Sequence, residues 1–111
     1  MNLIEAKAWA DQMDVQVTVC DMQSIIVYMN EASCANFSKY GGAKLIGQSL
    51  LDCHAPASRQ KIQAMLEVPQ TATSMLDKGD HRKIIHQIPW MEDGKHKGII
   101  EIAFKIPLVL P

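Results

Sequence analysis

The sequence contains few aromatic residues, no long apolar run and almost no net charge. Aromatic residues make up 5% of its 111 residues, and the formal net charge at pH 7 is −1. No uninterrupted apolar segment approaches the roughly 20 residues that a transmembrane helix requires. So small a net charge also provides no basic field to attract nucleic acid. The sequence therefore predicts a protein that binds neither membranes nor nucleic acid.

Signals for export and for disulfide formation are also missing. Residues 1–13 lack the apolar core of a secretory signal peptide, and they carry acidic side chains at Glu5 and Asp11. The 3 cysteines are an odd number without the spacing of a disulfide framework. Reduced thiols fit this pattern better, and they predict a cytoplasmic location.

Motifs for catalysis and metal binding are absent from the sequence. It has no Gly-x-Ser-x-Gly elbow, no Gly-rich phosphate loop, no His-Glu-x-x-His helix and no paired Cys or His spacing of a structural zinc site. We therefore predict that the protein is not an enzyme. A small enzyme is the least favoured alternative, and its base would have to be His54 or His86.

The residues that are present suffice for one domain. Apolar residues make up 48% of the chain, which is ordinary for a single hydrophobic core of this length. Methionine occurs 7 times, and its flexible side chain suits an irregular interior that contains a cavity.

The N-terminal segment, residues 1–14, has the pattern of an amphipathic helix. Leu3, Ala6, Trp9 (or Ala10) and Met13 recur at helical spacing and share one face. This apolar face either packs on the helix's own domain or pairs with a second copy of the chain, and the two arrangements are compatible.

The stretch from residue 15 to residue 58 begins with two predicted strands. Val15, Val17 and Val19 alternate with polar residues, which is typical of a half-buried strand, and residues 25–29 are β-branched and aromatic. Asn30 then stands where a helix N-cap belongs. Short helical segments are expected from there to residue 53.

The second half of the chain predicts one helix and three strands. Prolines bracket a helix over residues 57–67, and a Gly-containing turn separates the last two strands. This order predicts an α+β protein in which a five-stranded antiparallel sheet carries its helices on one face. The three strands are expected at residues 70–77, 81–91 and 98–106.

The last strand is apolar on both of its faces. Ile100, Ile102 and Phe104 share one side, while Ile99 and Ala103 share the other with two charged residues. We expect the first set to face the interior and the second set to lie on the outer face. Because an antiparallel sheet with a wet face alternates more cleanly, the outer face is expected to be covered by the N-terminal helix, a second subunit or both.

Several motifs together resemble the PAS sensor domains. The resemblance covers roughly residues 15–105. Two departures are a first hairpin turn without glycine, at residues 22–24, and a chain that runs into Pro107 where many relatives continue toward an output helix. The motifs are Asp21, Ile26-x-Tyr28-x-Asn30-x-x-Ser33, Phe37, residues 45–52, residues 89–94 and residues 98–102.

The resemblance implies a signal-sensing module over residues 15–106, followed by a short tail at 107–111. Such a module binds a small ligand in an apolar cavity, mediates protein–protein contacts, or does both in signal transduction of the bacterial type. The cavity is expected between the inner sheet face and the helices. The candidate binding residues are Tyr28, Phe37, Leu45, Leu50, Cys53, His54, Met65, Met75, Ile102 and Phe104.

The cofactor is left open by the sequence. A haem sensor would use His54 or Cys53 as the axial ligand, since imidazole and thiolate both bind haem iron. The preferred interpretation is that Cys53 is a small core residue and that His54 caps a helix or is exposed. Flavin adduct chemistry is not expected, because residues 40–51 lack the Asn-Cys-Arg stretch of flavin-binding relatives.

Output is expected to be non-covalent, because Pro107 and Pro111 oppose a continuing helix. We expect a homodimer formed through the N-terminal helix and the outer sheet face. The alternative is a ligand-free module that docks on a separate kinase, cyclase or regulator.

Overall fold

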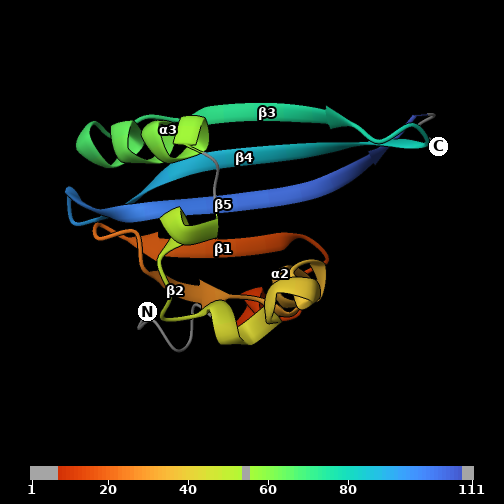
Figure 1. Ribbon diagram of the computed structural model, residues 1–111, viewed down its shortest axis with the longest axis horizontal. Coiled ribbons are helices and arrows are strands. Elements are labelled where there is room, and N and C mark those ends of the chain that lie inside the picture. The colour runs from red at the N-terminus through yellow and green to blue at the C-terminus, as the bar shows by residue number, and fades with distance from the viewer. Residues whose placement is uncertain (1–7, 54–55, 109–111) are drawn as a thin grey trace.

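The computed structural model describes residues 8–53 and 56–108, which form one sheet and a layer of helices (Figure 1). The sheet is antiparallel and five-stranded, in the order β2-β1-β5-β4-β3, as the sequence predicts. The last strand in the sequence, β5, is therefore central. The strands are β1 (Gln16–Asp21), β2 (Ile26–Met29), β3 (Ala72–Asp77), β4 (His81–Glu92) and β5 (Lys95–Pro107).

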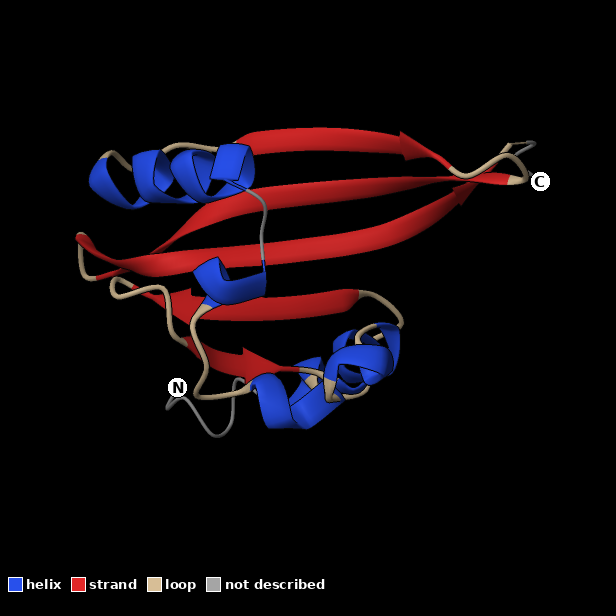
Figure 2. Cartoon of the chain, in the orientation of Figure 1, coloured by secondary structure: helices blue, strands red, loops and turns tan. Residues whose placement is uncertain are grey.

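The helices lie over one face of this sheet (Figure 2). Of these, α2 and α3 are α-helices, and α3 is bracketed by prolines as predicted, with Pro56 as its first residue. The others are short 3-10 helices that connect β2 to α3. The bounds are α2 (Glu31–Asn36), η1 (Ser38–Tyr40), η2 (Gly42–Leu45), η3 (Leu50–Cys53) and α3 (Pro56–Glu67).

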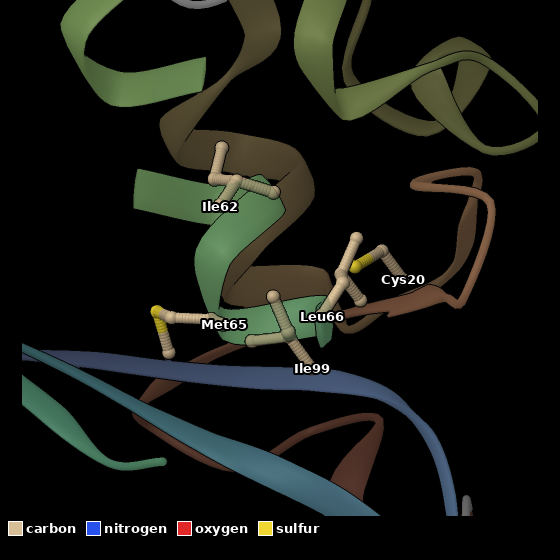
Figure 3. Close-up of a cluster of buried hydrophobic side chains, with 5 residues drawn as sticks. All are labelled: Cys20, Ile62, Met65, Leu66 and Ile99. Atoms are coloured by element: carbon tan, nitrogen blue, oxygen red, sulfur yellow. The ribbon is translucent and has the colours of Figure 1, made fainter. Parts of the chain in front are cut away.

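One buried cluster joins α3 to the middle of the sheet. Met65 and Leu66 project from α3 toward Cys20 of β1 and Ile99 of β5 (Figure 3). Cys20 and Ile99 are directly paired across the two strands, so their side chains share one face. This cluster fixes the helix-facing side of the sheet.

The close approach of β1 and β5 depends on a glycine. Gly98 has a φ of 155°, and a Cβ atom placed on it would lie 1.8 Å from the backbone oxygen of Cys20. Only a residue without a side chain fits here. Gly98 therefore holds the register in which Cys20 meets Ile99.

The turns use the polar residues of the sequence. The Asp21 carboxylate accepts hydrogen bonds from the backbone N–H groups of Gln23 and Ile25, at 2.9 and 3.0 Å. Asp93 and Gly94 both have positive φ in the β4–β5 hairpin, as a tight turn of that kind requires.

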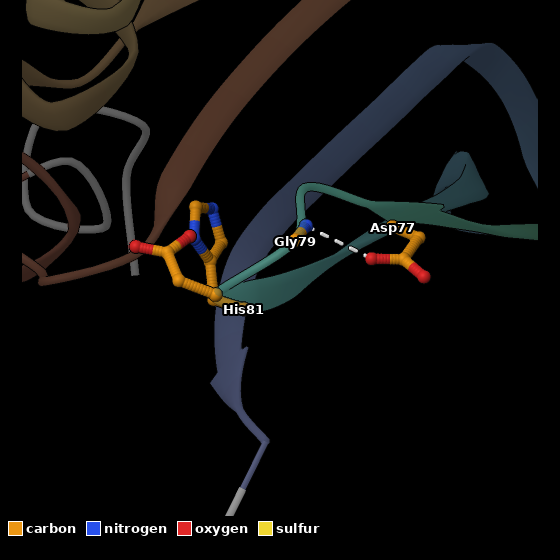
Figure 4. A network of polar contacts seen from close by, with 4 residues as sticks. Asp77, Gly79 and His81 are labelled. Atoms are coloured by element: carbon orange, nitrogen blue, oxygen red, sulfur yellow. Dashed lines mark hydrogen bonds and ion pairs between the residues drawn. The ribbon is translucent and has the colours of Figure 1, made fainter.

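The β3–β4 turn has its own polar contacts (Figure 4). Asp77 accepts a hydrogen bond from the Gly79 N–H at 2.9 Å. His81 Nδ1 lies 2.6 Å from Asp80 Oδ1, and this contact lowers the pKa of Asp80.

Asn30 joins the N-terminal segment, β1 and α2. Its side-chain oxygen accepts hydrogen bonds from the N–H groups of Val17 and Ser33, both at 3.0 Å. Its amide donates to the backbone oxygens of Ala10 and Val15, at 3.0 and 2.7 Å. The residue is 1% exposed, so every one of these bonds replaces water. The predicted N-cap is confirmed, and it has a wider role.

The structure reverses the predicted faces of β5. Ile99 and Ala103 are each 3% exposed and face the helices, whereas Phe104, on the opposite face, is 36% exposed. The prediction that Ile99 and Ala103 lie outside was therefore wrong. Both sets of side chains are apolar, so their pattern did not identify the face that receives α3.

The opposite face of the sheet is apolar and carries no helix among α2, α3 and the 3-10 helices. We call this surface the outer face. Residues that pair across neighbouring strands share a face, which assigns its members from the register. They include Met75 of β3, Val17 and Val19 of β1, Ile84, His86 and Ile88 of β4, and Ile100, Ile102 and Phe104 of β5.

The N-terminal segment is described from Ala8. Residues 8–10 are helical and Ala10 is buried, but Trp9 is 62% exposed. Leu3 and Ala6, which share the predicted apolar face with Trp9, lie outside the described residues. The described helices include none that is both long and apolar enough to cross a bilayer.

Candidate functional site

A cavity of about 820 Å³ lies between the helix-facing side of the sheet and the segment that contains α2 and the 3-10 helices. Its volume falls within the range of about 300–1,000 Å³ that small-molecule sites occupy. Its lining is mostly apolar with a few polar groups. The lining residues are Thr18, Ile26, Met29, Phe37, Tyr40, Leu45, Gln48, Leu50, Asp52 and Glu101.

The apolar wall is a second buried cluster, formed by Ile26, Met29 and Leu45. Phe37 and Leu50 pack against it. An irregularity in the β1–β2 pairing matches Cys20 with Ile26 and Thr18 with Met29. Because of this bulge, both β2 side chains face the cavity although they are three positions apart.

The segment with the 3-10 helices is attached to β2 by its backbone. The Gly47 N–H donates to the Ile26 oxygen at 2.7 Å, and the Ile26 N–H donates to the Gln48 oxygen at 2.9 Å. The Leu50 N–H donates to the Ser24 oxygen at 2.7 Å. These bonds place Leu45, Gln48 and Leu50 along one side of the cavity.

Glu101 is the half-buried charged group of the lining. It lies near the middle of β5, paired with Thr18 on one side and with Gln87 of β4 on the other. The Gln87 amide donates to Glu101 Oε1 at 3.1 Å. Thr18 is engaged elsewhere, since its hydroxyl lies 2.6 Å from the hydroxyl of Ser33.

The electrostatic character of the cavity is acidic. Glu101 and the exposed Asp52 are both in the lining, and none of its described residues is a lysine, arginine or histidine. The Lys83 ammonium donates to Gln16 and Asn36, at 3.4 and 3.3 Å. Burial, followed by the charge of Lys78, lowers the pKa of Lys83.

The structure places three of the predicted binding residues in this lining, namely Phe37, Leu45 and Leu50. Met65 is buried in the cluster beneath α3 instead. Cys53 ends η3, and its side chain, like the whole of His54, lies outside the described part.

The other four predicted residues lie away from the cavity. Ile102 and Phe104 are on the outer face, and Met75 pairs with Ile84 on the same face and is 60% exposed. Tyr28 pairs with Val19, and its hydroxyl donates to Asp11 at 2.5 Å. Burial, reinforced by this carboxylate, raises the pKa of Tyr28. The predicted cavity positions of Ile102, Phe104 and Met75 were wrong because the prediction interchanged the two faces of the sheet.

Seven lining residues were missed by sequence reasoning. Thr18 and Glu101 share the face of Cys20 and Ile99, so a correct choice of face would have identified both. Ile26 and Met29 required knowledge of the bulge. Of the remaining three, Tyr40 and Asp52 lie in the 3-10 helices η1 and η3, and Gln48 lies in the bend between η2 and η3. The sequence pattern does not determine the direction of these segments.

The described lining supplies no axial ligand for haem. Its described residues include no histidine or cysteine, and its two carboxylates would oppose the propionate groups, while the predicted axial ligands, His54 and the Cys53 side chain, lie outside the described part. Among the described residues, no three His, Cys, Asp or Glu side chains come together in a way that could hold a metal ion.

Comparisons with known proteins agree with this architecture. The family model of the PAS fold matches residues 10–106. A search of curated proteins gave no match.

Solved structures resemble the chain at low sequence identity. The VqmA dimer of Vibrio cholerae is 20% identical, with a TM-score of 0.65 over 96% of this chain and 52% of that chain. This chain therefore spans about half the length of VqmA. The Aer2 receptor of Vibrio cholerae, described as a dual PAS–haem oxygen sensor, is 20% identical, with a TM-score of 0.63 over 83% and 94% of the two chains.

A sensor histidine kinase of Vibrio cholerae is 18% identical, with a TM-score of 0.64 over 95% of this chain and 92% of that chain. These likenesses concern the fold, and the family match extends over nearly the whole sequence. The chain is a member of the PAS-fold family.

Proposed function

We propose that this chain is a non-enzymatic sensor module that binds a small molecule in the cavity between the sheet and the 3-10 helices. The observation that carries the proposal is the cavity of about 820 Å³ behind an apolar wall. A cavity of this kind binds by apolar enclosure, while a few polar groups orient the ligand. Phe37, Leu45 and Leu50 provide enclosure, and Glu101 is the polar group nearest the centre of the sheet.

Two relatives support a small-molecule role. VqmA has been solved with DPO bound, and the Aer2 receptor is described as a haem oxygen sensor. The fold therefore accommodates ligands of different size and chemistry. We propose a metal-free organic ligand, because the described carboxylates Glu101 and Asp52 oppose the propionates of haem; haem held by His54 or Cys53 is the alternative.

The experiment uses N-phenyl-1-naphthylamine, an uncharged dye whose fluorescence rises in apolar sites. We expect the wild-type protein to bind the dye and Leu45→Trp to bind at least tenfold more weakly, because the larger ring fills the cavity. Leu76→Trp is the matched control, since Leu76 is exposed on β3 away from the lining. Equal binding by all three proteins, or no binding by wild type, would overturn the proposal.

A second part of the proposal is a homodimer formed through the outer face and the N-terminal segment. The outer face is mostly apolar across β1, β5 and β4, with His86 among its isoleucines, and large apolar surfaces are uncommon on monomers. Trp9 is exposed close to the start of the same domain. VqmA is described as a dimer.

Sedimentation velocity at tens of micromolar tests the dimer. We expect a wild-type dimer and a folded monomer for Ile102→Glu, because Ile102 lies on the outer face. Trp9→Glu is expected to weaken the dimer if the N-terminal segment takes part. A monomeric wild type would favour the alternative, a module that docks on a separate kinase, cyclase or regulator.

The free thiols of Cys20 and Cys34 accord with a cytoplasmic location.

A further inference from the structure

The cavity carries a distribution of charge that restricts its ligand. Most of its wall is apolar, but the charged side chains in the described lining are both acidic, Glu101 and Asp52. An inference from this feature rests on the proposed function, because it concerns the ligand of the same cavity.

Glu101 is held in a fixed position on the helix-facing side of the sheet. It occupies the central strand, and the Gln87 amide from the neighbouring strand donates to its Oε1. This is the one hydrogen bond to the carboxylate within the described part of the chain, so its Oε2 retains accepting capacity. A half-buried carboxylate with a free oxygen beside an apolar wall is suited to accept a hydrogen bond from a ligand.

Among the described residues, no cation contacts this carboxylate directly. Lys83 lies on the same face of the sheet, but its ammonium contacts Gln16 and Asn36. The field of Glu101 reaches Cys20, whose pKa is raised first by burial and then by the charges of Asp21 and Glu101, partly offset by a hydrogen bond to the Ile99 backbone. An anionic ligand would have to enter against Glu101 and Asp52 without a cationic partner in the described lining.

We propose that the cavity selects a nitrogen-containing ligand, an amine or an uncharged N–H compound, whose N–H donates to Glu101 while its apolar body packs on the wall of Ile26, Met29 and Leu45. Ligands that carry a carboxylate or phosphate are rejected. Two charges inside a partly water-excluded cavity interact more strongly than they would in bulk water, so this discrimination is substantial.

Three probes of similar size and different charge test the selection. They are 3-phenylpropylamine, 3-phenylpropionamide and 3-phenylpropionate, each measured by displacement of N-phenyl-1-naphthylamine at low salt. We expect the amine and the amide to bind at least tenfold more tightly than the carboxylate. In Glu101→Gln, the advantage of the amine over the carboxylate should fall at least tenfold, while the amide changes less than threefold.

Controls separate this inference from the proposed function. Glu92→Gln removes an exposed charge outside the lining and should leave the order of the probes unchanged. Asp52→Asn should reduce the preference by a smaller factor than Glu101→Gln, and it keeps the test available if Glu101→Gln folds poorly. Thermal unfolding followed by circular dichroism reports on folding.

Each outcome has a distinct meaning. Failure of the wild type to bind the dye overturns the proposed function itself. Dye binding with equal or tighter binding of the carboxylate overturns the charge inference alone, as does dye binding that none of the three probes displaces. An amine preference that persists undiminished in both Glu101→Gln and Asp52→Asn would also overturn it, because the selectivity would then come from other groups.

Discussion

The two faces of β5 differ in polarity, and the helix-covered face is the more polar one, which reverses the usual arrangement. The helix-facing side of this strand carries Ile99 and Ala103 with Glu101 between them, whereas the outer face carries Ile100, Ile102 and Phe104. The side that packs against helices thus holds a carboxylate, and the side without them is continuously apolar.

This difference indicates that the faces serve different purposes. The helix-facing side combines two buried clusters with a cavity that keeps a polar group accessible. The outer face has apolar side chains without a covering helix among α2, α3 and the 3-10 helices, which suits contact with another chain. Variants that affect one face and spare the other can therefore separate folding, ligand binding and assembly.

The largest expected effect comes from breaking the register that assigns the faces. Gly98→Ala puts a methyl group against the Cys20 backbone oxygen, at a position that tolerates no side chain. We expect a loss of about 4 kcal/mol or more in the free energy of unfolding, in the range of exceptional substitutions. Urea denaturation followed by circular dichroism measures it. A loss below about 1 kcal/mol would show that β1 and β5 are farther apart than described.

Adjacent isoleucines compare the two faces directly. Ile99→Ala should lower the free energy of unfolding by about 3–4 kcal/mol, because it leaves a cavity in the cluster under α3. Ile100→Ala, on the outer face, should lower it by about 1–2 kcal/mol, since its side chain is already partly exposed. Both are measured at low micromolar concentration. An equal loss for the two would mean that the outer face is covered within one chain.

The two phenylalanines extend this comparison to aromatic side chains. Phe37 packs against the Ile26 cluster, while Phe104 is among the exposed apolar residues. We expect Phe37→Ala to lower the free energy of unfolding by about 2–3 kcal/mol and Phe104→Ala by about 1 kcal/mol. Phe104→Ala should instead weaken self-association in sedimentation. The reverse order of stabilities would restore the faces predicted from the sequence.

The smallest expected effect concerns the hydroxyl of Tyr28. Tyr28→Phe removes a hydrogen bond to Asp11 near the surface, and it should lower the free energy of unfolding by about 0.5–1 kcal/mol at neutral pH. The pKa of Tyr28 is higher in the folded protein than in the unfolded chain, where it is about 10. The stabilisation by the hydroxyl is therefore complete below about pH 10, and it is lost as the pH rises through the pKa of the folded state. Denaturation at pH 7 and above pH 10 checks this. A difference between the two proteins that grows with pH would contradict it.

The sequence predicted the elements of the fold better than the faces of the sheet. The turns at Asp21 and Asp93, the cap at Asn30 and the proline that starts α3 are local signals, and the structure has all of them. The five-stranded sheet followed from the order of the elements, and the PAS fold from the resemblance of the motifs to that family. Local signals suffice here because each depends on residues within a few positions.

Glu101 shows why the site was harder to predict. A strand-centred carboxylate is expected to mark the wet side of a sheet, because charged side chains are seldom buried. In this protein the Gln87 amide and an accessible cavity satisfy the carboxylate on the helix-facing side. The same misassignment placed Ile102 and Phe104 in the cavity, whereas Phe37 and Leu45 were found because they belong to helical segments that can only pack on the sheet.

The alternation of β5 side chains between the cavity and the outer face has a thermodynamic consequence. Glu101 lies between Ile100 and Ile102, so consecutive peptide groups join the cavity to the outer face. If a ligand that contacts Glu101 changes the dimerisation constant by some factor, linkage requires dimerisation to change the affinity for that ligand by the same factor. A tenfold effect in either direction would correspond to a coupling free energy of about 1.4 kcal/mol. The concentration of the protein would then set its sensitivity to the ligand.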